Sequence, residues 1–459
     1  MHDAGANEFS RTSLPHLLTP IADELDYSGG PRPLSARIGA AWVLALLFVL
    51  TAGAKFATRG PVLALSLSQD FKTFYAASRA WSLGMNPYDH ELLNAIVERA
   101  GASGGEHTWQ EEPSIYPPMT YAALSPIALL PWGPARLLWC VLNLACLTLL
   151  IGIVCRFGGL APLTMRMVLL YGAVLALQPS SAAMRVGQLS ILVATLGVAS
   201  LLLNQRGRDW SGGCLLGLAL ALKPQLALVF VAPALVSRRW KALLAVALTV
   251  SAIAIVSVLR IHAVSAWRAS WLSNLSSAFA PAGVNGVAAS SVHDRNMVNL
   301  QYPLRLIIDS FWMADVLALA IGAVLAAPAL GTLRSEGAGA ANFLEDISLL
   351  AVVELLVMYH RDYDALLLAL PLAWSLSPYV RLRRALPALL LIAVFFLPIL
   401  HVLYALDQTA AGHPLTSSLP VRLLVWPYQT WALLGLAGWL WYCRDRSQQQ
   451  INLACGDLA

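Results

Sequence analysis

The sequence predicts an all-α polytopic membrane protein: a bundle of about ten to twelve transmembrane helices with long extracytoplasmic loops. Two observations support this fold class. Of the 459 residues, 58% are hydrophobic and only 12% are charged, whereas a soluble domain carries about 25% charged residues. Apolar runs close to the length that crosses a bilayer recur along the whole chain, and they have the length of helices rather than strands.

Ten apolar segments are predicted to cross the membrane. They cover residues 38–57, 134–155, 165–177, 189–204, 242–258, 311–330, 347–359, 365–376, 385–403 and 423–442. Residues 119–130 lie between prolines and are too short to cross comfortably, so this segment is either re-entrant or strongly shortened. Residues 214–236 are interrupted by Lys223 and Pro224, which predicts either a hairpin of two half-helices or a kinked span.

Short basic loops predict the orientation of the chain. The basic residues at 206–208, 238–241, 381–384 and 444–446 are expected to face the cytoplasm by the positive-inside rule. Residues 1–36 are then a disordered cytoplasmic tail, residues 37–443 the membrane-embedded domain and residues 444–459 a second cytoplasmic tail. The first extracytoplasmic loop covers about 58–117, and the second large loop covers about 262–303. We expect a multi-pass protein of the plasma, or inner, membrane.

Composition and missing motifs exclude several classes of function. The net charge of +5 is spread over loops and indicates orientation in the membrane, so no nucleic-acid partner is expected. The six cysteines form no C-x-x-C pair and predict neither a disulfide framework nor a zinc site. The chain has no phosphate-binding loop of the ATPase type, no dinucleotide-binding glycine pattern, no hydrolase elbow and no H-E-x-x-H pair.

The segment that follows the first span, DFKTFYAASRAWSLGMNPYD, combines an acid with aromatic residues at the membrane surface. One interpretation is a site for a polar substrate carried on lipid, with Asp70 as general base and Tyr75 among the substrate-binding residues. The other is an amphipathic helix lying in the headgroups, with Asp70 in a capping role. The residues alone leave both interpretations open.

Further candidates lie in two polar segments. Lys223 interrupts an apolar run, and an intramembrane cation is either functional or a lysine that snorkels or neutralises a helix break. In YHRDYD, His360 and Arg361 can bind a phosphate. Asp362 and Asp364 have the D-x-D spacing of a metal site, but solvated or salt-bridged surface acids are the favoured interpretation.

Two loops hold the remaining candidates. In the second large loop, Arg295, Asn296 and Asn299 are placed to contact sugar hydroxyls or phosphate, although an ordinary solvated loop would also explain them. Gln188 follows a glycine in a short polar turn between two spans. It either lines a cavity or belongs to a plain turn.

Five segments in order resemble glycosyltransferase family 87, within the membrane-embedded GT-C class. The segments are DFKTFYAASRAWSLGMNPYD from Asp70, YPPMTYAALSPIALLP from Tyr116, the turn ending in Gln188, LKPQLAL around Lys223 and YHRDYDALLLALP around His360. Their order and spacing also fit, and they cover about residues 37–440. The chain departs from mycobacterial members of the family around His360, where YHRDYD replaces a run of Ser, Trp and paired His.

The resemblance implies transfer of a hexose, typically mannose, from a polyprenyl-phosphate donor to a lipid or glycan acceptor on the extracytoplasmic face. The essential first-loop acid of the family falls on Asp70, and its histidine near the donor phosphate falls on His360. We add Lys223 and Arg295 as groups that stabilise the leaving phosphate, and Tyr116 as a substrate-binding residue. No cofactor and no metal are expected, because cationic side chains balance the charge.

The expected product is α-linked, because a base at Asp70 would direct attack on a β-linked donor sugar with inversion. Envelope glycans or membrane lipids would be the acceptors. The main alternative is a transporter or flippase of lipid-linked sugars, which explains broken helices but not an acid and aromatics in a long first loop. A non-catalytic membrane scaffold explains the hydrophobicity alone.

Overall fold

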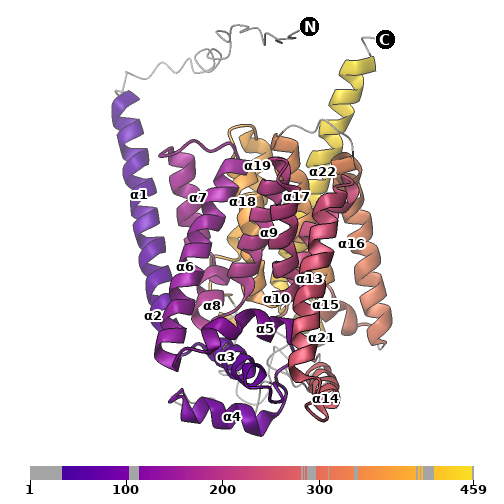
Figure 1. Ribbon diagram of the computed structural model, residues 1–459. Coiled ribbons are helices and arrows are strands. Elements are labelled where there is room, and N and C mark those ends of the chain that lie inside the picture. Colours follow the sequence, from indigo (N-terminus) through magenta and orange to yellow (C-terminus); the bar gives the residue numbers. More distant parts are fainter. Residues whose placement is uncertain are drawn as a thin grey trace, which may run out of the picture. The chain divides into compact units, whose positions relative to one another are not determined.

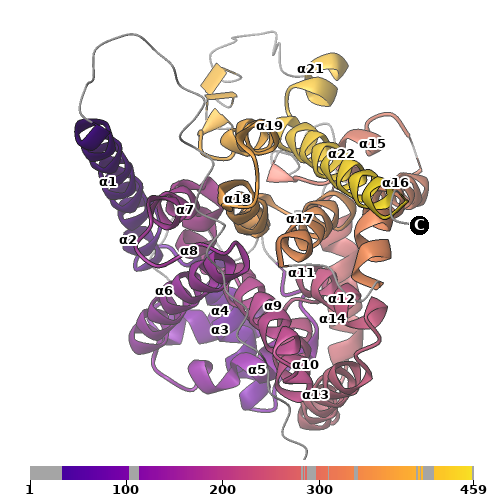
Figure 2. The same cartoon turned by 90° about the horizontal axis from the view of Figure 1, so that it is seen from above.

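The computed structural model describes residues 34–102, 113–280, 283, 285–286, 296–308, 310–334, 340–399, 402–403, 405–406 and 418–456. The contacts divide the chain into two units, Met1–Leu44 and Ala45–Ala459. In the first unit, the described part is the beginning of helix α1. All contacts discussed below belong to the second unit, whose described residues form helices and connecting turns (Figures 1 and 2).

Helices follow one another along the described chain. In the first half they are α1 (Leu34–Arg59), α2 (Pro61–Ala64), α3 (Gln69–Ser82), α4 (His90–Arg99), α5 (Pro118–Ala128), α6 (Trp132–Phe157), α7 (Met165–Ala176), α8 (Gln178–Val186), α9 (Ser190–Gln205) and α10 (Asp209–Leu222). In the second half they are α11 (Pro224–Ala227), η2 (Leu228–Phe230), α12 (Val231–Val236), α13 (Trp240–Ile261), α14 (Trp267–Phe279), α15 (Gln301–Arg305), α16 (Phe311–Arg334), α17 (Ala340–Val357), η4 (Asp362–Leu368), α18 (Ala369–Leu376), α19 (Leu382–Ala393), α21 (Leu419–Leu424) and α22 (Tyr428–Gly456).

Four stretches of the described chain are long and apolar enough to cross a membrane: Gly39–Ser82, which covers most of α1 together with α2 and α3, and helices α6, α13 and α16. A fifth is counted if α7 and α8, which meet at a 52° bend, form one broken span. The all-α, multi-pass class predicted from the sequence is confirmed. The long and apolar helices are nevertheless fewer than the ten to twelve crossings expected.

The difference in number arises because several expected spans are short helices. Helix α9, for example, has 16 residues, and at 1.5 Å per residue it extends for about 24 Å, less than the hydrocarbon core. Expected spans near 165–177, 365–376 and 385–403 contain helices of 12, 8 and 12 residues. Apolar runs therefore predict burial here, and part of that burial is in protein rather than in lipid.

The two unusual apolar segments form short helices, as expected. Helix α5 has 11 residues and begins at Pro118, and the segment around Lys223 is broken between α10 and α11. Proline occupies the first turn of α2, α5, α8, α11 and α21, where its missing N–H has no helical partner to lose. These prolines place helix starts next to the polar segments of the chain.

Helix α17 and the segment that follows it form part of the buried core. The side chains of residues 344–357 and 364–375 are buried along their whole length. Helix α17 packs against α16, α18 and α22, and η4 packs against α8 and α9. Figure 2 shows α17 and α18 among these neighbours. Polar groups at the end of α17 therefore lie inside the protein.

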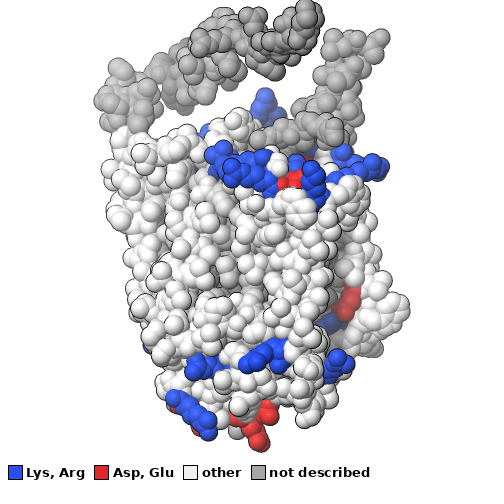
Figure 3. Space-filling model, viewed as in Figure 1, with Lys and Arg blue, Asp and Glu red and all other residues white. Residues whose placement is uncertain are grey.

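The basic loops meet at one end of the bundle. Arg239 forms an ion pair with Asp209 at 2.9 Å, the Ser237 hydroxyl donates to the carbonyl of Leu333 at 3.0 Å, and Trp439 donates to the carbonyl of Arg384 at 2.8 Å. Helices α3, α4 and α14 lie at the opposite end (Figure 1). On the face seen in Figure 3, Lys and Arg gather mainly in an upper and a lower band.

Candidate active site

A cavity of about 310 Å³ opens at the end of the bundle that carries α3 and α14. Polar groups enter it from α3, the Gln188 turn, the break at Lys223 and the segment after α17, and apolar groups enter it from α14. The lining residues are Asp70, Thr73, Phe74, Pro113, Ile115, Tyr116, Pro117, Gln188, Lys223, Gln225, Leu275, Phe279, Asn285, Met358, Tyr359, Arg361, Tyr363 and Asp364. Its volume is typical of sites that bind small molecules.

Helix α3 presents Asp70 to this cavity. The helix begins at Gln69, directly after Ser68, whose backbone is left-handed with φ of 41°. Asp70 thus lies in the first turn, where the helix dipole favours a negative charge. Thr73 and Phe74, three and four residues further on, lie on the same face and also line the cavity.

Gln188 holds the carboxylate of Asp70. Its amide nitrogen donates to Asp70 Oδ2 and to the hydroxyl of Tyr363, the latter at 3.1 Å. Its amide oxygen accepts from the backbone N–H of Leu189 at 3.1 Å and from the Tyr116 hydroxyl at 3.5 Å. The backbone N–H of Leu189 can bond only to the amide oxygen of Gln188, so the amide nitrogen of Gln188 must face the carboxylate of Asp70.

The turn before Gln188 requires a glycine. Gly187 ends α8 in the left-handed conformation, with φ of 74°, and its carbonyl accepts from Trp139 Nε1 at 3.0 Å. A β-carbon at this position would lie 2.6 Å from the β-carbon of Phe71. The close approach brings the Gln188 turn directly against α3 and so against Asp70.

Lys223 points into the cavity from the break between α10 and α11. Its side chain is 2% exposed, and the Thr120 hydroxyl supports the break by donating to the carbonyls of Ala221 and Leu222. The ammonium forms an ion pair with Asp364 and donates to the Ser190 hydroxyl at 3.1 Å. It also lies 4.9 Å above the ring of Tyr363.

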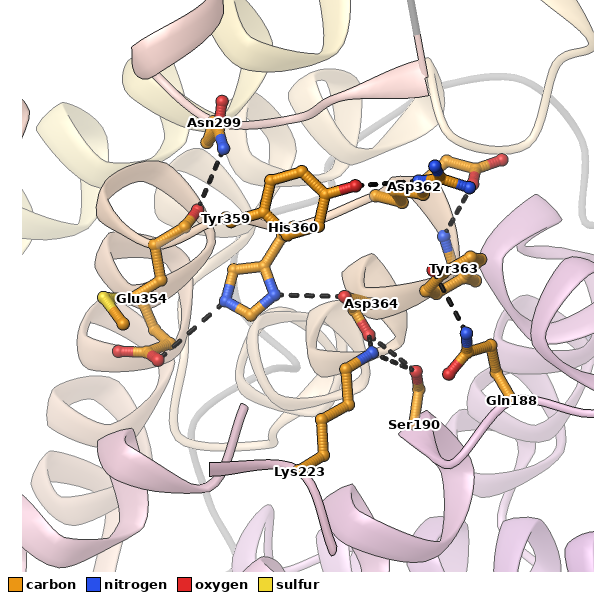
Figure 4. A network of polar contacts seen from close by, with 12 residues as sticks. Gln188, Ser190, Lys223, Asn299, Glu354, Tyr359, His360, Asp362, Tyr363 and Asp364 are labelled. Carbon is orange, nitrogen blue, oxygen red and sulfur yellow. Dashed lines mark hydrogen bonds and ion pairs between the residues drawn. The ribbon is translucent and has the colours of Figure 1, made fainter. Parts of the chain in front are cut away.

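A line of buried charges continues behind Lys223 (Figure 4). Asp364 Oδ2 lies 3.1 Å from Nδ1 of His360, and Nε2 of His360 lies 3.9 Å from a carboxylate oxygen of Glu354. His360 is fully buried. Two acids and two bases thus alternate from the cavity wall into the core, which offsets the desolvation of each group.

This arrangement shifts the pKa of two groups outside the apolar spans. Burial raises the pKa of Asp364, but the charge of Lys223 and the contacts with His360 outweigh it, and the pKa falls below its usual range. Burial lowers the pKa of His360, yet the hydrogen bond to Asp364 and the neighbouring Glu354 raise it above 6.5 on balance. The two groups therefore stabilise each other in their charged forms.

Arg361 supplies a second cation to the cavity. Its Nε donates to the Tyr359 hydroxyl at 2.9 Å and its Nη2 to the side-chain oxygen of Asn285 at 3.1 Å. A single antiparallel bridge between Arg361 and Met297 pins the backbone. The ring of Tyr359 meets Phe279 of α14 at 5.5 Å, so this wall connects the charged segment to α14.

Six of the residues named in the sequence analysis come together at the cavity: Asp70, Tyr116, Gln188, Lys223, Arg361 and Asp364. His360 does not line it and acts from behind Asp364. The interfacial-helix interpretation of the segment after Asp70 is partly right, because α3 lies at one end of the bundle, but most of its side chains are buried.

Three other candidates lie away from the cavity, and one lies outside the described residues. The Tyr75 hydroxyl donates to the carbonyl of Leu130 at 2.9 Å. Asn299 is buried and bonds the carbonyl of Met358 at 3.1 Å, so it has a structural role at the end of α17. Asn296 is half-buried and does not line the cavity. Arg295 belongs to the part that is not described.

The sequence interpretation missed Asp364. Solvated or salt-bridged surface acids were the favoured interpretation of the D-x-D pair. Asp364 does form an ion pair, with Lys223, but it is 2% exposed, so its expected position on the surface was wrong. The sequence did contain a partial signal for Asp364, because a buried lysine needs a counterion and YHRDYD contains two acids. Within the described residues, no three His, Cys, Asp or Glu side chains are grouped so as to hold a metal ion.

The fold is that of a helical membrane protein, and a cavity of the size of a small-molecule site lies at one end of its bundle. The chain belongs to glycosyltransferase family 87, whose model matches residues 115–358. The match includes Tyr116, Gln188 and Lys223; Asp70 lies before it and His360 after it.

Curated relatives come from two strains of Mycobacterium tuberculosis, CDC 1551 / Oshkosh and H37Rv. Both are named alpha-(1->3)-arabinofuranosyltransferase and are 26% identical to the chain over 222 residues. The aligned part is 48% of this chain and 46% of each relative, so the chain spans about half the length of the curated relatives it matches. No solved structure matches.

Proposed function

We propose that the protein transfers a sugar from a polyprenyl-phosphate donor to a hydroxyl of a lipid or glycan acceptor, with Asp70 as general base. The observation that carries the proposal is the composition of the cavity wall. It holds the carboxylate of Asp70, bound by Gln188, together with Arg361 and the ion pair of Lys223 with Asp364. A base and positive charge are the two requirements of this transfer.

The reaction balances with these groups alone. The acceptor oxygen forms a bond to the anomeric carbon while its proton passes to Asp70. The bond between that carbon and the phosphate oxygen breaks, and the electron pair leaves with the polyprenyl phosphate. Attack from the face opposite the phosphate inverts the configuration, so a β-linked donor yields an α-linked product. One carboxylate suffices, because the leaving phosphate needs no proton.

Lys223 and Arg361 are the groups we assign to the departing phosphate. Each is held by fixed partners, Lys223 by Asp364 and Ser190 and Arg361 by Tyr359 and Asn285. Preorganised cations lower the energy of charge that develops during the reaction. His360 would act through Asp364, as a positioning residue for Lys223. With this charge available, we propose that neither a metal nor a cofactor takes part.

We further propose that the site faces the extracytoplasmic side of the plasma membrane. The basic loops around Arg239, Leu333 and Arg384 share the end of the bundle away from α3. If that end follows the positive-inside rule, it faces the cytoplasm, and the cavity faces outward. Cysteine accessibility in whole cells, compared between Arg208→Cys and Asn86→Cys, tests this orientation.

The donor sugar has two candidates. The resemblance found in the sequence favours mannose, whereas the curated relatives are named for arabinofuranose transfer. We take mannose as the first candidate and arabinofuranose as its competitor. Both can be offered to the purified protein as β-linked polyprenyl-phosphate sugars, with membrane lipids and envelope glycans as acceptors, and the labelled product is then measured.

Asp70→Asn tests the base. The substitution keeps the shape of the side chain but removes the proton acceptor, and we expect transfer to fall by at least about 100-fold, as is typical for loss of a general base. Asp89→Asn is the matched control. Asp89 is an N-cap that accepts from the N–H of Leu92, it does not line the cavity, and asparagine preserves its capping role.

Equal transfer by Asp70→Asn and wild type would refute the assignment of the base. A β-linked product would refute inversion. Sugar movement across the membrane without transfer to any acceptor would instead support a flippase of lipid-linked sugars.

A further inference from the structure

Helix α3 has two polar faces, of which the cavity uses one. Asp70, Thr73 and Phe74 line the cavity, whereas Lys72 and Arg79 lie on a different stripe together with Tyr75, at spacings of three and four residues. Side chains with this spacing follow one another along one side of a helix. The second stripe runs beside the connection between α5 and α6.

Two of the three donors on this stripe have acceptors at that connection. Arg79 donates to the carbonyls of Ala128 and Leu129, both at 2.9 Å, and Tyr75 donates to the carbonyl of Leu130 at 2.9 Å. Lys72 is next in line and is 7% exposed. In the described part of the chain, its ammonium makes no hydrogen bond or ion pair, and it is not among the unpaired atoms that are closed off from solvent.

A second cation lies beside Lys72. Arg136 belongs to the first turns of α6, its guanidinium lies 5.6 Å from the centre of the Trp132 ring, and its buried Nε has no hydrogen-bond partner. Tyr75, on the same stripe as Lys72, meets the Trp132 ring at 5.3 Å, so this stripe lies against the turn of α6 that carries Arg136. The positive charges of Lys72 and Arg136 repel each other. Lys72 is 7% exposed and Arg136 is half-buried. In the described part of the chain no acidic side chain pairs with either cation, which is unfavourable, and the unpaired buried Nε of Arg136 adds to the cost.

The beginning of α6 adds to the positive potential. No side chain caps the helix at Pro131, and a helix N-terminus carries a partial positive charge that favours an anion. Arg136 lies just beyond this first turn, so its charge adds to the partial positive charge of the helix end. The buried, unpaired Lys72 points independently to the same missing ligand.

We propose that Lys72 and Arg136 bind the phosphate of an anionic phospholipid, at a site separate from the cavity. Helix α6 is a membrane-span candidate that begins at Trp132, so the pair lies where headgroups meet the span. Leu129, Leu137 and Leu138 are 63%, 55% and 44% exposed and offer contact to acyl chains. A basic pair at the end of a span, next to an aromatic residue, suits a lipid headgroup.

The proposed site joins a lipid to the helix that carries Asp70. A phosphate at Lys72 would give its ammonium the acceptor that Arg79 and Tyr75 already have. It would also bridge α3 to α6 at the level of the cavity. Anionic lipid is therefore expected to stabilise the end of the bundle at which Asp70 lies.

The test measures lipid binding by the purified protein in nanodiscs. Wild type, Lys72→Met and Arg136→Gln are compared in phosphatidylcholine alone and with increasing phosphatidylglycerol. The matched control is the pair Arg206→Gln and Arg208→Gln, two exposed residues of the basic end. We expect each of Lys72→Met and Arg136→Gln to weaken the preference for phosphatidylglycerol about fivefold, with no change in the control.

Thermal unfolding separates binding from a structural role. Without anionic lipid, Lys72→Met should unfold at the same temperature as wild type or higher, because it removes an unpaired buried charge. With phosphatidylglycerol the order should reverse, since only wild type gains the phosphate contact.

Three results would overturn the proposal. The first is an unchanged lipid preference in both variants. The second is equal destabilisation by Lys72→Met in both lipids, which would show a structural lysine. The third is full protection by inorganic phosphate in phosphatidylcholine, which would show a site for free anions.

Discussion

Breaking the ion pair between Lys223 and Asp364 should destabilise the protein far more than breaking an exposed pair. Both side chains are 2% exposed, so a partner that loses its counterion stays buried. The perturbations are Lys223→Met and Asp364→Asn, which keep most of the side-chain volume. The double variant removes both charges together.

The structure sets the size of the effect. Removing one partner of a buried pair costs about 3–5 kcal/mol. Lys223→Met should lie near the lower limit, because Asp364 keeps Ser190 and His360 as partners. Asp364→Asn should lie near the upper limit, because Lys223 keeps the Ser190 hydroxyl and the ring of Tyr363, while His360 loses its carboxylate. The double variant should recover much of the loss, since no lone charge remains.

Reversible unfolding in mixed detergent micelles measures these free energies. Asp209→Asn is the matched control, because its pair with Arg239 also joins a basic side chain to an aspartate, but the side chains of Arg239 and Asp209 are 35% and 21% exposed. An exposed pair contributes at most about 1 kcal/mol. Transfer activity is measured on the same samples, because Lys223 is also assigned to the leaving phosphate.

Equal losses for Asp364→Asn and Asp209→Asn would refute the reasoning. So would a double variant that loses the sum of the two single losses, because additive losses mean that the two charges do not interact.

Three further predictions follow from the same site. Gly187→Ala should cost about 1–3 kcal/mol more than Gly207→Ala in unfolding measurements: both glycines have positive φ, but a β-carbon meets Phe71 at the first and nothing within 4 Å at the second. Because the pKa of His360 is raised in the folded state, its protonation stabilises the fold below about pH 6.5, and this contribution is lost as pH rises through the folded pKa. The free energy of unfolding is measured against pH for wild type and His360→Gln, and identical pH dependence in the two proteins would contradict this prediction. A chelator should leave transfer unchanged, because cationic side chains line the cavity; strong inhibition would indicate a metal.

Much of the fold class was predictable from local pattern. Apolar runs predicted membrane helices, and Pro118 and the pair Lys223-Pro224 predicted the short helix α5 and the break after α10. The number of crossings was not predictable in this way. An apolar run indicates burial, and α9 and α18 are buried largely by other helices, which hydropathy cannot distinguish from lipid.

The site was predictable in part, and residue chemistry explains where prediction ended. Asp70 and Lys223 stood out because a charge beside or within an apolar run is costly. Asp364 did not stand out, because an acid next to a loop is common on surfaces. Tyr75 was selected as one of several aromatic residues near Asp70. A shift of one position along a helix moves a side chain to another face, and Tyr75 lies on a face of α3 that does not line the cavity.

The sequence by itself determined that this is a helical membrane protein of glycosyltransferase family 87 with an unusual buried lysine. Only the tertiary structure decided that Lys223 pairs with Asp364, 141 positions away, and that Gln188 holds Asp70 from 118 positions away. Local pattern reports the cost of placing a charge in an apolar segment. The partner that offsets this cost is supplied by packing between distant helices, which no local pattern contains.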